Sequence, residues 1–300
     1  MNEDSITAIY CSVDDFCKVF DLYCKSRLLL GEKATKLFPA SCMSLSEVMT
    51  IILLFQLSNY RNFKAFYREY VCTHMQGYFP NTVSYNRFVE LKPYTLMPLL
   101  LFTQVFRLGK PTGISFIDST SLSVCHNRRI YSNKVFKCYA ARGKTSVGWF
   151  YGFKLHLIIN NLGEICSFYL SPGNVDDRNI NVINHLCRGL WGKLFGDRGY
   201  ISKALFEQLY EQNIHLITRL KKNMKNVLMS MEDKLLLRKR AVIESVNDFL
   251  KNVCQVEHSR HRSIPNFLVN LLAAISAYSF LPHKPSIHGF GDEKALMIIV

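Results

Sequence analysis

Residues 114–121, ISFIDSTS, form a short apolar run that stops at an acid. The breakers Pro111 and Gly113 stand before it and its apolar residues are β-formers, so the run predicts a buried strand that ends at Asp118. A carboxylate at the mouth of a central strand is costly unless it is paired or bound to a cation. Asp118 is therefore the first candidate for a metal-binding carboxylate.

Strand patterns dominate the chain after this run. Residues 147–160, VGWFYGFKLHLIIN, are aromatic and β-branched, a turn of sequence NNLG follows, and residues 164–170 return as the second strand of a hairpin. Two shorter runs, 193–196 and 214–220, predict further strands. The first of these ends on Asp197, a second acid at the end of a predicted strand.

Helical patterns separate the later strands. Residues 175–190 carry one that begins with Asp176 and Asp177, acids that suit the positively polarised start of a helix. Residues 202–212 carry another, and a long basic helix is predicted for residues 234–253. Three strands followed by alternating helices and strands predict an α/β fold, a mixed sheet flanked by helices.

The first hundred residues have helical periodicity instead. Apolar residues recur at i, i+3, i+4, i+7 and i+8 in residues 16–24, 45–53 and 63–71. Ser44 and Glu47 have the spacing of a capping box at the start of the middle segment. The polar and basic residues of this region are either DNA contacts of a helix-turn-helix-like unit or solvated faces of a helical bundle.

Composition restricts the class of partner. The chain of 300 residues has 37 Lys and Arg against 23 Asp and Glu, for a formal net charge of +14. This excess suits a polyanionic partner such as nucleic acid, or it serves solubility alone. None of the ten cysteines forms a C-x-x-C pair, which predicts reduced thiols of a cytosolic chain. The longest apolar runs fall short of the roughly 20 residues that span a bilayer, so a soluble protein is expected.

Five sequence blocks carry a resemblance to a known family. They are FIDSTS at residues 116–121, YGFKLHLI at 151–158, SPGNVDDR at 171–178, FGDRGYIS at 195–202 and KRAVIESVNDFLK at 239–251. Through these blocks the chain resembles DDE transposases of the ribonuclease-H-like, retroviral-integrase superfamily, and most of all those of the insertion sequence 982 family. The last block matches the wider Y-x2-R-x3-E-x6-K pattern at Arg240, Glu244 and Lys251, but Leu237 stands in place of the tyrosine.

The resemblance implies a ribonuclease-H-like fold preceded by an all-helical domain. Residues 1–110 are expected to form a helical N-terminal DNA-binding domain, residues 111–285 the DDE catalytic domain and residues 286–300 a C-terminal tail. The implied protein is cytoplasmic and nucleoid-associated, and it binds double-stranded DNA, both the terminal inverted repeats of a transposon and the target. A homodimer is implied because two transposon ends must be paired, and no membrane is involved.

The resemblance also implies three catalytic, metal-binding carboxylates: Asp118, Asp197 and Glu244. Two Mg²⁺ ions, with Mn²⁺ as a substitute, are expected to activate a water that cuts the transposon end, after which the freed 3′-hydroxyl joins to target DNA. Magnesium takes hard oxygen ligands and keeps several waters, so a few carboxylates suffice. Two alternatives stay open: a ribonuclease-H-like DNA nuclease or resolvase that cuts without joining, and an inactive DNA-binding remnant of a transposase.

Basic residues beside the third carboxylate are predicted to contact DNA. On a regular α-helix, Arg240 and Lys251 lie within roughly 40° of Glu244, so one face presents a carboxylate flanked by two cations. The alternative is an ordinary i, i+4 ion pair between Arg240 and Glu244. Asp248, one turn further on, is the rival for the third carboxylate.

Other predicted DNA contacts come from the strand region: Lys154, His156, Arg219, Lys221 and Lys222. Lys154 and His156 alternate with apolar neighbours, so both are expected on one face of their strand, within reach of the scissile phosphate or the metal. A further basic cluster with interleaved aromatic residues lies between the first strand and the hairpin and suits the same DNA channel. It comprises Arg128, Arg129, Lys134, Lys137, Arg142 and Lys144, with Tyr131, Phe136 and Tyr139.

Overall fold

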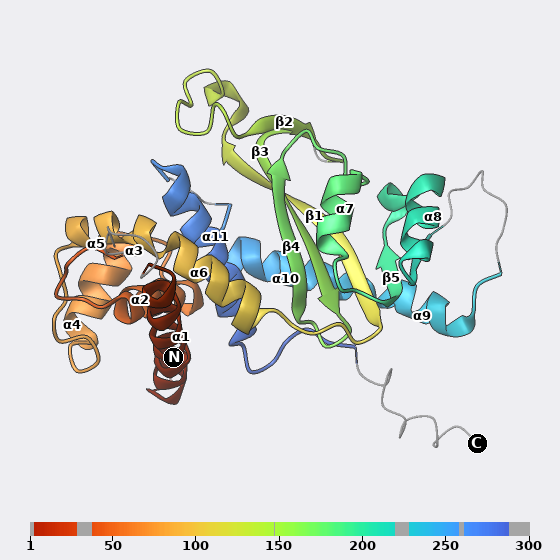
Figure 1. The fold of residues 1–300 in the computed structure, drawn as a ribbon. Coiled ribbons are helices and arrows are strands. Elements are labelled where there is room, and N and C mark those ends of the chain that lie inside the picture. The colour runs from red at the N-terminus through yellow and green to blue at the C-terminus, as the bar shows by residue number, and fades with distance from the viewer. Residues whose placement is uncertain (1–2, 29–37, 147, 220–227, 258–260, 288–300) are drawn as a thin grey trace. The chain divides into compact units, whose positions relative to one another are not determined.

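The computed structural model describes residues 3–28, 38–146, 148–219, 228–257 and 261–287. The chain divides into two compact units, which are coloured along the sequence in Figure 1. The helical unit comprises Met1–Arg107 and Leu250–Leu281, and the sheet unit comprises Leu108–Phe249 and Pro282–Val300.

Ten helical segments lie wholly within the described residues of the helical unit. They are α1 (Glu3–Leu28), α2 (Leu45–Leu57), α3 (Phe63–Ala65), the π-helix η1 (Phe66–Val71), α4 (Cys72–His74), α5 (Tyr85–Leu91), the 3-10 helix η2 (Lys92–Thr95), α6 (Leu96–Phe102), the π-helix η3 (Thr103–Arg107) and α11 (Ile264–Ser279). None of the described helices is long and apolar enough to cross a membrane.

Local sequence signals account for where these helices begin. The Ser44 hydroxyl accepts a hydrogen bond from the Glu47 N–H at 3.1 Å, and the Glu47 carboxylate accepts one from the Ser44 N–H, which confirms the capping box that starts α2. The prediction of one regular helix over residues 63–71 is wrong in its backbone. There, α3 passes at Phe66 into π-helical geometry.

The centre of the helical unit is the packing of α11 against α2 and α6. The Gln56 amide donates to the Asn270 side chain at 2.8 Å inside this interface, and the hydroxyls of Thr103 and Ser276 share a hydrogen bond of 2.7 Å. Residues 264–279 therefore fold with the N-terminal helices, whereas the sequence grouped them with residues 111–285. The assignment of DNA binding to residues 1–110 stays a prediction.

The sheet unit contains six strands: β1 (Ile114–Cys125), β2 (Ala141–Lys144), β3 (Trp149–Asn160), β4 (Ile165–Pro172), β5 (Gly192–Gly196) and β6 (Ile214–Thr218). β1, β3 and β4 form an antiparallel meander, while β5 pairs parallel with β1 and β6 parallel with β5. β2 extends the edge of β3 that β4 also occupies. The order β4–β3–β1–β5–β6 is the ribonuclease-H-like arrangement, so the predicted fold class is confirmed.

Helices cover the sheet, as Figure 1 shows for α7 in front of it and α10 behind it. They are α7 (Ile180–Leu186), α8 (Lys203–Glu211), α9 (Met231–Lys239) and α10 (Ala241–Asp248), and the π-helix η6 (Phe249–Val253) follows α10. One hydrophobic core joins Ile117 and Ile158 of the strands to Val182 of α7 and Leu205 of α8. Burial of these apolar side chains holds α7 and α8 on the sheet.

Two predicted helices differ from the observed ones. The long helix expected over residues 234–253 is divided into α9 and α10 at Arg240, whose own dihedral angles stay in the right-handed helical region, and it ends in the π-helical turn η6. The helix expected from residue 175 begins at Ile180 instead, with Asn179 as its cap. The predicted capping role of Asp176 and Asp177 is therefore wrong, because both acids lie before the cap.

Candidate active site

Asp118 lies inside β1, paired with Leu157 of β3, and not at the end of the strand as the apolar run predicted. On its other edge, β1 pairs in parallel with β5, and this pairing ends at Phe116 opposite Phe195. Continued by two residues, the same register brings Asp118 opposite Asp197, at the point where the two strands separate. Neighbouring strands are about 4.8 Å apart, so the register explains why these acids are close.

The surroundings of Asp118 compensate its negative charge only in part. Its side chain is 22% exposed, Oδ2 accepts a hydrogen bond of 3.1 Å from the Asn247 amide, and Oδ1 lies 3.8 Å from Nη1 of Arg240. Burial raises the pKa of Asp118 to about 6, the Arg240 guanidinium opposes this rise, and the negative charges of Asp197 and Glu244 add to it. The structure thus brings the first predicted carboxylate within electrostatic range of the other two.

Glu244 reaches this region from α10 and is 58% exposed. Its Oε1 accepts a hydrogen bond of 2.8 Å from Nη2 of Arg240, so the i, i+4 contact that the spacing predicted is present. The same guanidinium faces Asp118 and therefore links the two carboxylates. Nη1 of Arg240 is buried and has no hydrogen-bond partner within the described ranges.

Lys251 does not follow the geometry that the sequence suggested. It lies in the π-helical turn η6, where the angular step per residue differs from that of an α-helix, and its amine pairs with Glu257 at 3.2 Å. The estimate that placed it beside Glu244 assumed a regular α-helix and does not apply. Asp248, the rival for the third carboxylate, is the last residue of α10 and is exposed.

Asp197 follows β5 and caps the 3-10 helix η5 (Arg198–Tyr200), where its Oδ1 accepts a hydrogen bond of 2.8 Å from the Gly199 N–H. Tyr200, the last residue of η5, is buried in the core that α7 and α8 form with the sheet. Burial raises the pKa of Tyr200, and the negative charges of Asp177, Asp118 and Asp197 raise it further. Tyr200 thus stays protonated among several acids.

A fourth acid, Asp177, was assigned the wrong role from the sequence. Its Oδ1 accepts hydrogen bonds from the Ser119 hydroxyl at 2.9 Å and the Lys154 amine at 3.1 Å, and it lies 3.9 Å from Nδ1 of His156. These four residues are the Asp177 cluster. The available signal was the period of two in the strands, because Ser119 stands directly opposite His156 in the register.

Two predicted DNA contacts belong to this cluster, on the other face of the sheet from Asp118. Lys154 is 14% exposed and also donates to the Val175 carbonyl at 2.9 Å. His156 is fully buried, and its Nε2 shares a hydrogen bond of 2.8 Å with the Ser171 hydroxyl. Burial lowers the pKa of His156, so the ring is neutral at pH 7. A ring without exposed surface does not touch DNA in this conformation.

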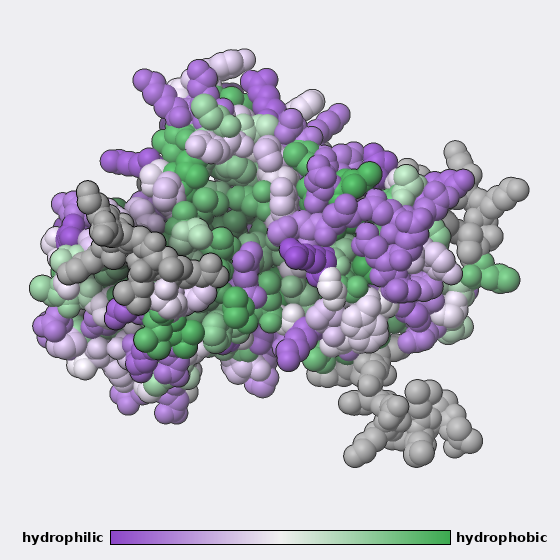
Figure 2. Space-filling model, viewed as in Figure 1, coloured by the Kyte–Doolittle hydropathy of each residue, from purple (hydrophilic) through white to green (hydrophobic). Residues whose placement is uncertain are grey.

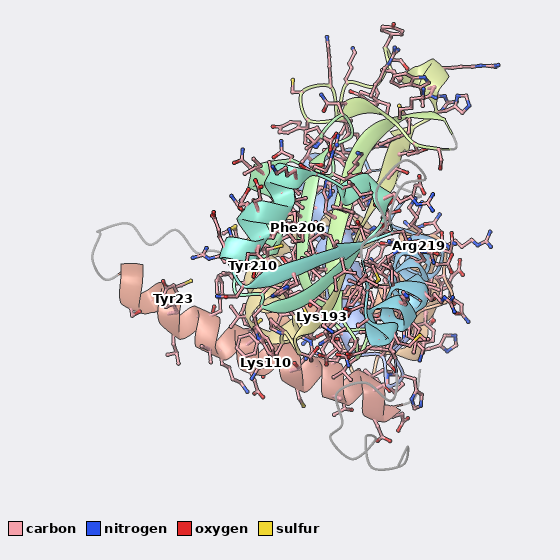
Figure 3. All side chains as sticks on the ribbon, turned by 90° about the vertical axis from the view of Figure 1, so that its right-hand side faces the viewer. Tyr23, Lys110, Lys193, Phe206, Tyr210 and Arg219 are labelled. Carbon is pink, nitrogen blue, oxygen red and sulfur yellow. The ribbon has the colours of Figure 1, made fainter. Side chains whose placement is uncertain are left out.

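Arg219 directly follows β6 and is exposed; Figure 3 labels it. Its position suits a phosphate contact. Lys221 and Lys222 lie outside the described residues.

The three predicted carboxylates are chemically suited to bind a hard divalent cation. Asp118, Asp197 and Glu244 supply carboxylate oxygens, the ligands that Mg²⁺ prefers, and the raised pKa of Asp118 indicates an acid whose charge lacks full compensation. Within the part of the chain that the structure describes, however, no three His, Cys, Asp or Glu side chains are gathered closely enough to hold a metal ion. Arg240 supplies the positive charge between Asp118 and Glu244.

A ribonuclease-H-like sheet with acids on β1, after β5 and on α10 defines the class of this protein. A sequence model of the family described as "Transposase DDE domain" matches residues 108–264, more than half of the chain. The chain belongs to this family, and it is a transposase by that membership. Comparison with curated proteins gave no match.

Solved structures also resemble this chain. One is a chain of the piggyBac transposase synaptic complex with hairpin DNA, determined by cryo-EM, with a TM-score of 0.41 and 8% sequence identity. The alignment covers 86% of this chain and 70% of that chain. The likeness is too distant for residues to be matched between the two.

Proposed function

We propose that this protein is an insertion-sequence transposase that cleaves transposon-end DNA and joins the freed 3′-hydroxyl to target DNA. The observation that carries the proposal is the placement of Asp118, which is mostly buried, opposite Asp197 and linked to Glu244 through Arg240. Resemblance of its sequence blocks supports the insertion sequence 982 family as the finer assignment. The proposed substrates are terminal inverted repeats and target duplex, handled by a homodimer in the cytoplasm.

The three carboxylates are proposed to hold two divalent cations, Mg²⁺ or Mn²⁺. The cations would supply activation of the attacking oxygen and charge stabilisation of the leaving oxygen. The negative charges of both Asp197 and Glu244 act on Asp118, so a cation held by Asp118 is attracted by all three acids. Asp197 is held in place by its bond to the Gly199 N–H, while the exposed Glu244 is held only at one oxygen, by Arg240.

Arg240 is proposed to contact the phosphodiester. Its side chain is 20% exposed and lies between Asp118 and Glu244, where the phosphodiester is proposed to bind. A phosphate oxygen is the natural acceptor for a guanidinium, since Arg pairs with phosphate through a planar fork. Lys251 and Arg219, with Lys221 and Lys222, are proposed as further phosphate contacts along the DNA.

The test is a cleavage and strand-transfer assay on a labelled transposon-end duplex with Mg²⁺. Wild type is expected to give joined products, and Asp197→Asn is expected to give neither nicks nor joined products while still binding the duplex. Nicks without joining by wild type would replace the proposal with a nuclease or resolvase. If wild type and Asp197→Asn both bound the duplex and neither cleaved it, the protein would be an inactive remnant of a transposase.

A further inference from the structure

The segment between β1 and β3 carries an unusual concentration of positive charge. The six cations Arg128, Arg129, Lys134, Lys137, Arg142 and Lys144 are all exposed. No Asp or Glu occurs in the sequence between Asp118 and Glu164 to neutralise them. Figure 2 shows hydrophilic side chains at the top of the molecule, where Figure 1 draws this segment. We call these cations, together with Tyr131, Tyr139 and Trp149, the cationic platform.

The aromatic rings of the platform face solvent. Tyr131 is 90% exposed, Trp149 is 62% exposed and Tyr139 is 59% exposed. Rings of this size contribute most of their favourable energy when they are covered, so a group of them in solvent indicates a surface that something else covers. Solubility explains the lysines and arginines alone but does not explain the rings.

Two of the rings are paired with cations of the platform. The Arg142 guanidinium lies 5.6 Å from the ring centroid of Tyr131 and its Nη2 lies 3.4 Å from the Tyr131 hydroxyl. The Lys144 amine lies 5.8 Å from the ring centroid of Trp149, which is its direct partner across β2 and β3. A cation beside each ring restricts the ring and places positive charge where a base and its phosphate would meet.

The platform is anchored to the sheet and is not a loose loop. Phe136 is buried and packs edge-to-face on Phe153 with 5.9 Å between ring centroids. The Asn127 amide donates to the Trp149 carbonyl at 2.7 Å, which fixes the start of β3. At Gly143 of β2, a Cβ would lie 2.1 Å from the Gly173 carbonyl oxygen, so β2 passes closer to its neighbours than a larger residue permits.

We propose that the cationic platform binds unpaired nucleotides of DNA, with bases stacked on Tyr131 and Trp149 and phosphates held by the six cations. An intact duplex hides the faces of its bases within the stack, so it satisfies the cations but leaves the rings exposed. Unpaired bases offer both a π-face and a phosphate. The inference rests on the proposed function in that the chain acts on DNA, and it adds a site for a strand that is opened during the reaction.

The first experiment measures binding of the full-length protein by fluorescence anisotropy to an oligo-dT strand and to a duplex, each of about 20 nucleotides per strand. Trp149→Ala is expected to weaken oligo-dT binding about 10-fold and duplex binding less than about 2-fold. Trp149→Phe, which keeps an aromatic face, is expected to retain most of the affinity. The matched control is Trp191→Ala, because Trp191 is 54% exposed but lies outside the platform, and no change is expected for either probe.

The second measurement uses the fact that the chain has two tryptophans, Trp149 and Trp191. In a Trp191→Phe variant, the fluorescence of Trp149 is expected to be quenched by oligo-dT and little changed by the duplex. Equal losses on both probes for Trp149→Ala, or no loss on oligo-dT, overturn the inference while the proposed function stands. Failure of the wild-type protein to bind either probe overturns both.

The charge of the platform is tested separately from its rings. The double variant Lys134→Gln, Lys137→Gln is expected to weaken binding of both probes and to reduce its dependence on salt, because each phosphate contact releases counterions. A loss confined to one probe would show that these lysines do not act as phosphate contacts and would contradict the shared role given to the six cations.

Discussion

Two acids, Asp177 and Asp118, lie on opposite faces of β1, and their surroundings differ. On one face, Asp177 receives two hydrogen bonds, from Ser119 and Lys154, and has His156 beside it. On the other face, Asp118 accepts hydrogen bonds from the Asn247 amide and the Ser119 backbone N–H and has a guanidinium at 3.8 Å, yet burial still raises its pKa. The fold thus pairs Asp177 with a cation and a hydroxyl and leaves the charge of Asp118 short of compensation, although Ser119, which contacts Asp177, is the neighbour of Asp118 in β1.

This difference separates a structural acid from a functional one. A carboxylate that is fully paired stabilises the fold and has no capacity left for a ligand, whereas an incompletely compensated carboxylate keeps lone pairs for a cation. We infer that the Asp177 cluster holds the sheet in place so that Asp118 can remain under-compensated. Substitutions of Asp118 and Asp177 test this difference.

The largest effect is expected from Asp118→Asn on catalysis. The substitution keeps the size of the side chain but removes the charge that a cation requires, so cleavage of the transposon end is expected to fall about 1,000-fold or more. Single-turnover cleavage with excess enzyme measures this. Duplex binding is expected to persist, and retained cleavage by Asp118→Asn would show that another acid occupies the central position.

The opposite face is expected to respond in stability. Asp177→Ala leaves the Ser119 hydroxyl without its acceptor and the Lys154 ammonium without its carboxylate, although the bond from Lys154 to the Val175 carbonyl remains. Removal of one partner from a mostly buried ion pair costs about 3 kcal/mol of unfolding free energy. Urea unfolding at pH 7.5 measures the loss. The control is Asp176→Ala, which removes an exposed acid whose side-chain bonds within the described residues go to its neighbour Arg178, and a change below about 0.5 kcal/mol is expected there.

If the two aspartates gave equal losses, the stabilising role would belong to the loop as a whole and not to the contacts of Asp177. The contacts of Asp177 would then not distinguish it from Asp118 as an acid that stabilises the fold.

Local patterns in the sequence are sufficient for much of this architecture. The hairpin of β3 and β4, the strands β5 and β6 and the capping box at Ser44 depend on residues close together in the chain, so periodicity and turn signals predict them. The strand of Asp118 was predicted to stop at the acid because its apolar run stops there. In the structure β1 continues to Cys125, because β3 continues to supply hydrogen-bonding partners.

Features that depend on distant partners were not predictable in this way. The acceptor role of Asp177 requires Ser119, which is 58 residues away in sequence, and Lys154. No Pro or Gly predicts the division between α9 and α10 at Arg240. At this division the Arg240 guanidinium faces Asp118, on a strand far earlier in the chain. Resemblance to a family identified Arg240 and Glu244 as a pair, but only the fold shows that Asp118 shares the same guanidinium.

The smallest expected effect is that of Asp118→Asn on stability. Its sign is opposite to that of Asp177→Ala, because removal of the Asp118 charge is expected to stabilise the fold. The pKa of Asp118 is raised from 3.8 to about 6, so in the folded protein the protonated form is favoured, and ionisation above this pKa destabilises the fold. Asp118→Asn removes that penalty and is expected to stabilise the protein by about 2 kcal/mol at pH 7.5, after allowance for residual exposure.

The gain is expected to shrink as the pH falls from 6 toward 3.8 and to vanish below 3.8, where the carboxyl is protonated in both the folded and the unfolded state. Urea unfolding of wild type and Asp118→Asn across this pH range measures it. Since the same substitution is expected to abolish cleavage, a gain in stability together with a loss of activity would show that the charge of Asp118 is retained for chemistry at the expense of the fold. A loss of stability at pH 7.5 would instead place Asp118 with Asp177, as an acid whose contacts hold the sheet together.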